Sequence, residues 1–315
     1  KNVAASIDHF IDYKFKHLSR IANIPQLIRI FKNVKEQPHI THQTISSLRA
    51  KLRIDPDFLS FSLMDAEGNI VLSTSDMANI DFGSRPLFFE AMKGKKNVSP
   101  PSLDEGKPSI YFSIPIKHTN KLALDTDRGI LGVLVAQCDA EELWKLIETE
   151  TGRVGSGNAV ILSNSDGVRI AHSTTRDLIF KSWTPLKPEV EEQILKEKRY
   201  GSDIKEITST DIPEVMDAVT KALPPQYFQH GLVIGKGTYH SVIKIMNNGW
   251  RIIATIPEAT FLEPVHTSIF YMGIISSIIT CVVIVASIVI GQLSTKRIHA
   301  FASISKEIAR GNFTN

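Results

Sequence analysis

The hydrophobic pattern changes character several times along the chain, and its longest uniform stretch runs from Thr267 to Leu293. This stretch contains no Asp, Glu, Lys or Arg and is dominated by Ile and Val. As a helix it would be about 40 Å long, which exceeds the roughly 30 Å hydrocarbon core of a bilayer. A buried core helix is the alternative, although such helices rarely stay uncharged on every face for so many turns. The pattern predicts a transmembrane helix over residues 267–293.

The charges on either side of this stretch predict its orientation. Glu258 and Glu263 precede it, whereas basic residues follow it closely: Lys296, Arg297, Lys306 and Arg310. Loops rich in Lys and Arg stay on the cytoplasmic side of a membrane. We therefore expect residues 1–266 to be extracytoplasmic and residues 296–315 to be cytoplasmic, with the crossing in the inner membrane.

The first 35 residues have the pattern of an amphipathic helix, because apolar side chains recur at helical spacing from Val3 to Ala22. Pro25 is expected to kink this helix. Its apolar stripe would face either the body of the domain or the same helix of a second subunit, so we expect a homodimer. A second helix is expected from about Thr41 to Arg53. His39 and His42 have a spacing that suits a metal, but a solvated loop is favoured and no metal site is predicted.

Two short strands around a polar turn are predicted between Phe58 and Ser73, with the turn at Asp65 to Asn69. About 100 residues later, Asn158 to Ser173 repeats this hairpin pattern. Each hairpin is followed by an irregular stretch, a closing apolar strand and a helix; the closing strands are Gly129 to Gln137 and Gly249 to Pro257. The pattern predicts an α+β fold with two antiparallel-sheet modules, at residues 36–150 and 151–264.

Composition narrows the function classes. The formal net charge of the chain is only +3, and it sums the charge of an external domain and of a short basic tail. This small positive charge indicates no nucleic-acid partner. Cys138 lies in the outer part and Cys281 within the apolar stretch, so we expect no disulfide between them. No complete catalytic motif is found: Gly235-Lys236-Gly237-Thr238 is interpreted as a loop, and Gly155-Ser156-Gly157 as the link between modules. We predict no enzyme activity and no cofactor for this chain, and expect any enzymatic output to follow Asn315.

The residues resemble the double Cache (dCACHE) sensor family of bacterial transmembrane receptors, whose modules are PAS-like. The resemblance covers Lys1 to about Pro264 and is most specific in DFGSRPLFFEAMKGKKNVSPP and GKPSIYFSIPI of the first module. The second module adds the Asp-Gly turn with His172 and a closing strand at Gly249-Trp250. The segment from Lys205 to Lys244 fits this family poorly and is expected to be an elaborated loop with a short helix.

The segment after the apolar stretch, KRIHAFASISKEIARGNFTN, resembles the first helix of a HAMP linker. Its apolar positions are Ile298, Phe301, Ile304 and Ile308, a spacing that suits a parallel helical bundle. Arg297 stands where such linkers usually have a Pro. A plain juxtamembrane helix that ends at Gly311 is the alternative.

The resemblance also implies a ligand site in the first module. In amino-acid-binding members an Arg holds the ligand carboxylate, an aromatic pair encloses the ligand and an Asp on the last strand takes the ammonium. Here Arg85 is present, but Leu87 and Phe88 replace the Trp and Tyr, and Gln137 stands at the Asp position. We therefore expect an organic acid and not a free amino acid.

The remaining site expectations come from the strand after Lys107. Tyr111 and Ser113 share one face of this strand, and Ser109 at its start is expected to complete the polar lining. Arg85 has an alternative role, in which it pairs with Asp81 or caps the following helix. His172 in the second module is expected to be structural.

Taken together, the sequence predicts an extracytoplasmic small-molecule sensor of a dimeric two-component or chemotaxis receptor. A sensor histidine kinase is the favoured output and a methyl-accepting chemoreceptor is the alternative. An accessory membrane protein that uses its modules for protein contacts is a further alternative.

Overall fold

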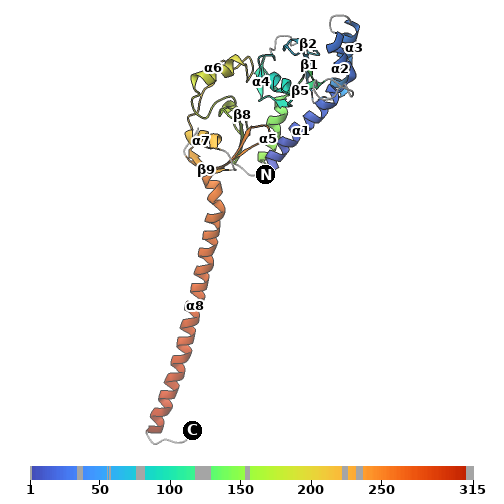
Figure 1. Ribbon diagram of the computed structural model, residues 1–315. Coiled ribbons are helices and arrows are strands. Elements are labelled where there is room, and N and C mark those ends of the chain that lie inside the picture. The colour runs from blue at the N-terminus through green and yellow to red at the C-terminus, as the bar shows by residue number, and fades with distance from the viewer. Residues whose placement is uncertain are drawn as a thin grey trace. The chain divides into compact units, whose positions relative to one another are not determined.

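The computed structural model describes residues 2–33, 38–54, 56, 58–75, 82–117, 129–152, 157–221, 226–231 and 237–309. The chain divides into two compact units, Lys1–Glu258 and Ala259–Asn315. The first unit contains two antiparallel sheets and is coloured from blue to orange in Figure 1.

The distal module is built on a sheet with the strand order β2-β1-β6-β5-β3, and β4 pairs with β5 beside β3. Its strands are β1 (Ser60–Met64), β2 (Ile70–Ser73), β3 (Asn97–Val98), β4 (Ser102–Asp104), β5 (Lys107–Lys117) and β6 (Ile130–Asp139). Its helices are α1 (Asn2–Ala22), α2 (Pro25–Asn33), α3 (Pro38–Ile54), α4 (Pro86–Met92) and α5 (Ala140–Gly152). The expected hairpin is confirmed as β1 and β2, which are antiparallel neighbours.

The expected N-terminal helix is divided in two, because α1 ends at Ala22 and α2 begins at Pro25. Proline has no N–H for a helical hydrogen bond and fits the first turn of a new helix, which explains the break at this position. His39 and His42 lie within helix α3, so the expected loop at these positions is wrong. Among the described residues, no group of three side chains could hold a metal ion.

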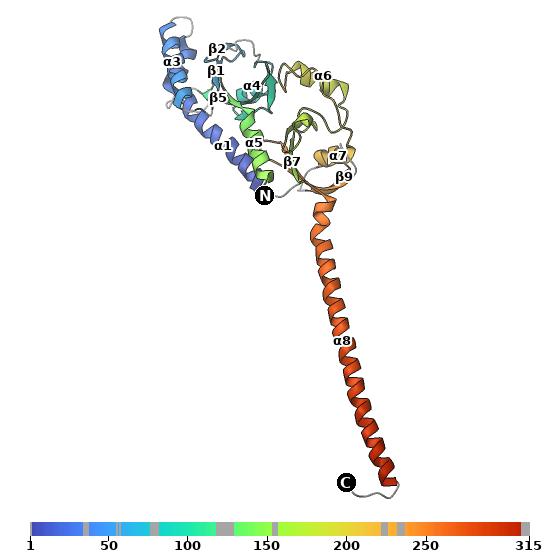
Figure 2. The same cartoon turned by 180° about the vertical axis from the view of Figure 1, so that it is seen from behind.

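The distal sheet has a different covering on each face. Helices α1 and α5 pack together and against β5 on one face, and they lie side by side in Figures 1 and 2. Alternate residues of β5, including Ile110 and Phe112, join the large hydrophobic core on this face. Helix α4 contacts β3, β5 and β6 with a smaller core that includes Tyr111. The alternation of a pleated strand therefore separates the face that holds the N-terminal helix from the face that holds α4.

The proximal module is built on a five-stranded sheet with the order β8-β7-β11-β10-β9. Its strands are β7 (Ala159–Ser163), β8 (Arg169–His172), β9 (Gln226–Gly231), β10 (Thr238–Ile245) and β11 (Arg251–Pro257). Its helices are the 3-10 helix η1 (Arg176–Leu178), α6 (Pro188–Lys196) and α7 (Pro213–Lys221), with α6 and α7 drawn in yellow in Figures 1 and 2. The second predicted hairpin is confirmed as β7 and β8.

Residues 205–244 contain regular structure as well as loop. Strands β9 and β10 pair over six residues, and β10 also pairs with the closing strand β11. The expectation of an elaborated loop with one short helix is therefore wrong for the strand residues, although α7 supplies the short helix. Polar residues such as His240 and Lys244 interrupt the apolar pattern of β10, which explains why the strand signal was weak.

The two modules meet through backbone contacts. The Leu103 N–H donates to the Tyr200 carbonyl at 2.8 Å, and the Asp203 N–H donates to the Leu103 carbonyl at 3.2 Å. Between them, Gly201 has φ +97°, and a Cβ added there would lie 2.1 Å from the Leu103 carbonyl oxygen. Only glycine permits this backbone conformation and this close approach together. On α5, the Trp144 indole donates to the Ile170 carbonyl of β8 at 3.0 Å, which adds a second connection.

The second unit consists of most of helix α8 (Glu258–Ala309), which begins directly after β11. The apolar stretch 267–293 lies within this helix, and its large hydrophobic side chains are exposed. Within its own unit this helix is not surrounded by other elements, which favours a membrane span over a buried core helix. Among the described residues, this is the one helix long and apolar enough to cross a membrane. The helix continues through Ile298, Phe301 and Ile304, whose side chains are also exposed.

Candidate functional site

The candidate site is built on the face of the distal sheet that α4 covers. Alternation along β5 places the side chains of Ser109, Tyr111 and Ser113 on this face, and all three residues are fully buried. The Ser113 hydroxyl donates to the Leu87 carbonyl at 2.8 Å, which fixes the first turn of α4 against β5. Tyr111 and Ser113 thus share one face, as the spacing predicts.

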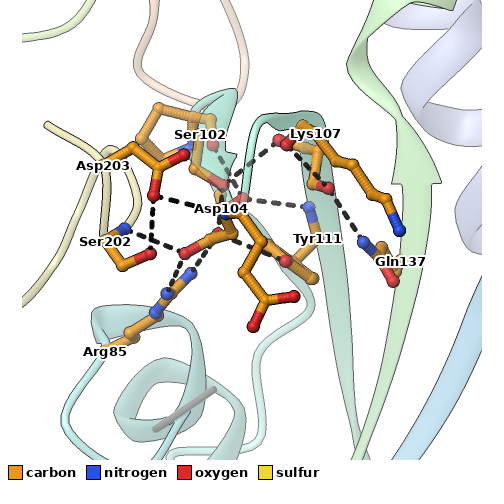
Figure 3. A network of polar contacts seen from close by, with 12 residues as sticks. Arg85, Ser102, Asp104, Lys107, Tyr111, Gln137, Ser202 and Asp203 are labelled. Carbon is orange, nitrogen blue, oxygen red and sulfur yellow. Dashed lines mark hydrogen bonds and ion pairs between the residues drawn. The ribbon is translucent and has the colours of Figure 1, made fainter. Parts of the chain in front are cut away.

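Arg85 lies at the N-cap of α4, and its side chain pairs with Asp104 of β4 (Figure 3). Its Nη2 lies 3.1 Å from Asp104 Oδ1, and its Nη1 lies 3.4 Å from Oδ2. Arg85 is 3% exposed and Asp104 is 2% exposed, so both charges are removed from water. The Arg85 side chain makes no capping hydrogen bond. The other proposed partner, Asp81, lies outside the described residues.

Asp104 is the centre of a polar network (Figure 3). The Ser102 hydroxyl donates to its Oδ2 at 3.1 Å, and the Tyr111 hydroxyl donates to the same oxygen at 3.3 Å. From the proximal module, the Ser202 N–H donates to Oδ1 at 3.0 Å. Burial, followed by the negative charge of Asp104, raises the pKa of Tyr111, so this phenol stays protonated and can donate.

Sequence reasoning missed Asp104. The sequence offered Asp81 as a partner of Arg85 and the position of Gln137 as the place of an acidic residue, whereas the carboxylate comes from β4. The register of β4 on β5, with Ser102 opposite Ser109, brings Asp104 back to the sheet face that carries Tyr111. The available signal was an acidic residue beside the Glu105-Gly106 turn, between two short strands. The argument that the site has no carboxylate is therefore wrong, although the ligand itself is not tested by this finding.

Gln137 of β6 connects three strands. Its Nε2 donates to the Ser109 hydroxyl at 2.8 Å, and its Oε1 accepts from the Ser60 hydroxyl at 2.8 Å. These contacts hold β1, β5 and β6 together at one end of the sheet. Gln137 is 6% exposed, so its amide lies within the protein and not at an open surface.

Leu87 and Phe88 lie in the small hydrophobic core under α4, where both are buried. The Phe88 ring also approaches the turn at Gly68 between β1 and β2. This core consists of Met64, Phe82, Leu87, Phe88, Ala91, Tyr111, Val133 and Val135. The structure thus gathers all seven predicted site residues on or beside one sheet face, where they are buried and packed, and Arg85 and Leu87 also border a cavity.

The proximal module has a second buried polar group. Arg169 of β8 is fully buried and donates only to neutral oxygens: the Leu178 and Ser182 carbonyls and the Thr210 hydroxyl. Its guanidinium lies 4.2 Å from the Trp183 ring centroid. Burial lowers the pKa of Arg169 to about 10. Cation–π contact and carbonyl dipoles therefore take the place of a counter-ion among the described residues.

His172 lines a cavity of about 190 Å³ in the proximal module. Its Nδ1 accepts from the Thr175 N–H at 3.1 Å. Burial, and then the nearby charge of Arg169, lowers the pKa of His172 to about 4. The imidazole is therefore neutral at physiological pH and orders the turn after β8, which agrees with a structural role.

Two tandem antiparallel-sheet modules behind an N-terminal helix, with one candidate membrane-spanning helix among the described residues, define an architecture consistent with tandem PAS-like modules. The Cache domain family matches residues 1–265, and the chain belongs to this family. Cache sensor domains are ligand-binding modules without enzyme activity. A Cache domain followed by such a helix points to a membrane receptor. No curated protein matches the sequence.

Solved structures of sensor domains share this fold. The sensor domain of the V. cholerae histidine kinase DctB is 17% identical, with a TM-score of 0.60, over 82% of this chain and 93% of that chain. The ligand-binding domain of the Campylobacter jejuni chemoreceptor Tlp3, in complex with 4-methylisoleucine, is 16% identical, with a TM-score of 0.53, over 82% and 88%. The extracellular domain of the putative histidine kinase rpHK1S-Z16 is 15% identical, with a TM-score of 0.50, over 83% and 94%. At these identities the likeness concerns the fold alone.

Proposed function

We propose that this chain is the extracytoplasmic input part of a homodimeric membrane receptor and binds a small carboxylate ligand in its distal module. The observation that carries the proposal is the buried Arg85–Asp104 pair on the α4 face of the distal sheet. Burying two charges is costly, and apolar residues would stabilise the core at least as well. A role in recognising a charged ligand gives a reason for this pair.

The charge balance of the site favours one kind of carboxylate. Arg85 can exchange its contacts with Asp104 for a ligand carboxylate, which leaves Asp104 available to a cation. A ligand that carries both a carboxylate and an ammonium group satisfies both side chains, whereas an organic acid adds an unbalanced negative charge to a buried site. We therefore prefer an amino acid over the organic acid suggested by Gln137. The Tlp3 domain, whose structures contain isoleucine and valine, has the same fold.

The contacts of Asp104 also suggest how ligand binding in the distal module could affect the proximal module. It accepts from Arg85 and Tyr111 on one side and from the Ser202 N–H of the proximal module on the other. A ligand carboxylate that binds Arg85 would break the Arg85–Asp104 ion pair. The Asp104 carboxylate, which accepts from the Ser202 N–H, would then lose its neutralising partner. The ligand would thus favour one of two arrangements of the modules, and the closing strand β11 leads into α8 along the chain.

For the output of the receptor we propose two alternatives and favour neither. The preference for a histidine kinase was based on an elaborated loop at residues 205–244, and part of that segment forms β9 and β10. A histidine kinase and a methyl-accepting chemoreceptor are therefore proposed as equal alternatives. The helical continuation of α8 to Ala309, with its HAMP-like apolar spacing, supports either of these over an accessory protein.

Calorimetry on the whole chain in detergent tests the ligand proposal. The probes are amino acids together with their deaminated acids, for example L-isoleucine and 3-methylpentanoate. We expect an amino acid to bind, and the double variant Arg85→Met/Asp104→Leu to weaken its binding by about 30-fold to 1000-fold. Arg20→Met, on the exposed side of α1, is the matched control. Tight binding that persists in the double variant would show that these two residues are not the ligand site.

A further inference from the structure

A cavity of about 350 Å³ lies between the two modules, outside the core under α4. From the distal module it is lined by the start of α4, by β3 and by the residues that follow β3. From the proximal module it is lined by the turns before β8 and β11 and by Arg199. Its volume is within the range of pockets that hold small metabolites.

The charged side chains that line this cavity are all positive, and the other polar lining side chains are neutral Asn and Ser. Three arginines, Arg85, Arg199 and Arg251, line it, and no Asp or Glu is among its described lining residues. Two of these arginines form ion pairs with carboxylates that do not line the cavity: Arg85 with Asp104, and Arg199 with Asp166 and Glu197.

Arg251 differs from the other two arginines. Its Nη1 donates to the Gly249 carbonyl at 2.6 Å and its Nε to the Val219 carbonyl at 3.4 Å. Within the described residues it forms no ion pair, and burial lowers the pKa of its guanidinium. Asp166 attracts this guanidinium from beyond ion-pair distance, so Arg251 is the one arginine among the described lining residues that has no carboxylate in direct contact.

Two further donors of this lining have no acceptor among the described residues. These are the buried Nε of Arg85 and the buried Nδ2 of Asn248. The Asn248 side chain is held in place, since its Oδ1 accepts from the Trp250 N–H at 3.1 Å. Buried donors without acceptors are uncommon in folded proteins, and here two of them belong to the residues that line a single cavity.

The cavity also has an apolar wall. Trp250 supplies an aromatic surface, and the other apolar contributors are Pro86, Leu87, Val98 and Pro100. We propose that this cavity is a second ligand site, which takes a small organic monoanion with its oxyanion group at Arg251 and Asn248 and its hydrophobic body against Trp250. Arg251, which has no carboxylate in direct contact, accounts for a single negative charge, and the apolar wall accounts for the hydrophobic body. Such a ligand would contact both modules and stabilise their junction.

This cavity shares Arg85 and Leu87 with the residues of the proposed distal site, so the test uses Arg251 and Asn248. Cyclohexanecarboxylate is the probe, and the uncharged cyclohexanecarboxamide is its control; both are titrated calorimetrically into the whole chain in detergent. We expect the carboxylate to bind more tightly than the amide. Arg251→Gln should weaken its binding by about 10-fold to 100-fold, and Asn248→Ala by a smaller factor. Arg20→Gln removes the same charge elsewhere and should leave binding unchanged.

Several outcomes would overturn this inference. They are the absence of binding of the carboxylate below about 10 mM, equal binding of the amide, and binding that Arg251→Gln leaves unchanged. Binding that is lost in Asp104→Asn but kept in Arg251→Gln would place the acid in the distal network, which refutes the second site but not the proposed function. Arg251→Lys keeps the positive charge and should retain part of the affinity. This variant therefore distinguishes a loss of the charge from a loss of the fold.

Discussion

Asp104 receives five hydrogen bonds: two from the Arg85 guanidinium and one each from Ser102, Tyr111 and the Ser202 backbone. A buried carboxylate is tolerated only when its charge is paired and its lone pairs are occupied, and both conditions are met here. This one side chain therefore joins the proposed ligand site to the junction between the modules.

A double-mutant cycle measures how strongly Arg85 and Asp104 depend on each other. Asp104→Leu alone should lower the free energy of unfolding by about 3 to 5 kcal/mol, because it leaves the Arg85 charge buried without a partner. Adding Arg85→Met should restore much of this loss, since neither charge is then buried. Urea unfolding of the four proteins gives the coupling energy. Additive effects of the two substitutions would contradict the buried pair.

The lowered pKa of His172 predicts acid sensitivity. The unfolded histidine binds a proton near pH 6.5, whereas the folded one does so only near pH 4. Between these values the unfolded state holds more protons, so stability falls as the pH falls from 6.5 to 4. The loss should be on the order of 3 kcal/mol, and His172→Asn should reduce it because Asn keeps an acceptor but does not titrate. Thermal unfolding across this range is the measurement; an equal pH slope in both proteins would exclude His172 as its source.

The sequence predicted which side chains share a face of one strand, because this follows from alternation along that strand. It did not predict contacts between residues of different strands, because these depend on the pairing register. The shared face of Tyr111 and Ser113 follows from alternation along β5 alone. The contact between Arg85 and Asp104 depends on how β4 folds back on β5, which a local pattern does not encode. Alternation also could not show that the Gln137 side chain forms hydrogen bonds with Ser60 and Ser109, which belong to other strands.

At the scale of elements, helix α1 uses its apolar stripe within its own module. Ile7 and Leu18 are fully buried, and Lys14 forms an ion pair with Glu142 of α5 at 2.8 Å. The Phe10 ring packs edge-on against Phe112 of β5. The buried apolar stripe of α1 is therefore explained without a second subunit. A dimer contact through α1 would use the outer side of the helix, where Tyr13 is 41% exposed.

Disulfide cross-linking tests the proposed homodimer. In a cysteine-free background, Tyr13→Cys on α1 and Ile304→Cys on α8 should cross-link between chains, because both side chains lie on exposed faces that suit parallel helix contacts. Arg49→Cys on α3, an exposed position away from these faces, is the control. Mild oxidation followed by non-reducing electrophoresis gives the result. If neither position reacts faster than Arg49→Cys, the chain does not form the proposed dimer.

The hairpins and closing strands were predictable because alternation, turn residues and repetition agreed with one another. The division between α1 and α2 was indicated by Pro25, but only as a kink. Strands β9, at the edge of the sheet, and β10, next to it, were missed because residues such as Tyr227 and Val242 are exposed, which blurs the contrast between buried and exposed positions.

At the scale of the whole molecule, the unit Lys1–Glu258 holds both modules, and the second unit holds the apolar helix. The exposed apolar side chains of α8 make this helix a candidate membrane span, whereas the first unit buries its apolar side chains in cores of its own. The basic residues after Leu293 then predict which side of the membrane each end occupies.

Accessibility labelling tests this topology. In the cysteine-free background, Lys205→Cys should react in intact cells with maleimides that cannot cross the inner membrane. Lys306→Cys should react only with permeant maleimides, because residues after the crossing are expected in the cytoplasm. The reverse pattern would refute the proposed orientation and with it the sensor on the outside. Labelling of both positions after cell lysis is the control for reactivity.

The tight passage of Gly201 past Leu103 has a consequence for building hybrid receptors. A distal module taken from another protein would meet this backbone only if its own β4 had the same shape and hydrogen-bonding groups, since the partners at 2.8 and 3.2 Å are backbone atoms and not exchangeable side chains. The point near residue 150 where the sequence suggests that the modules could be cut is therefore a poor site for fusion. A hybrid joined after Glu258, where the first compact unit ends, would keep both modules in their native pairing and transfer them as one cassette.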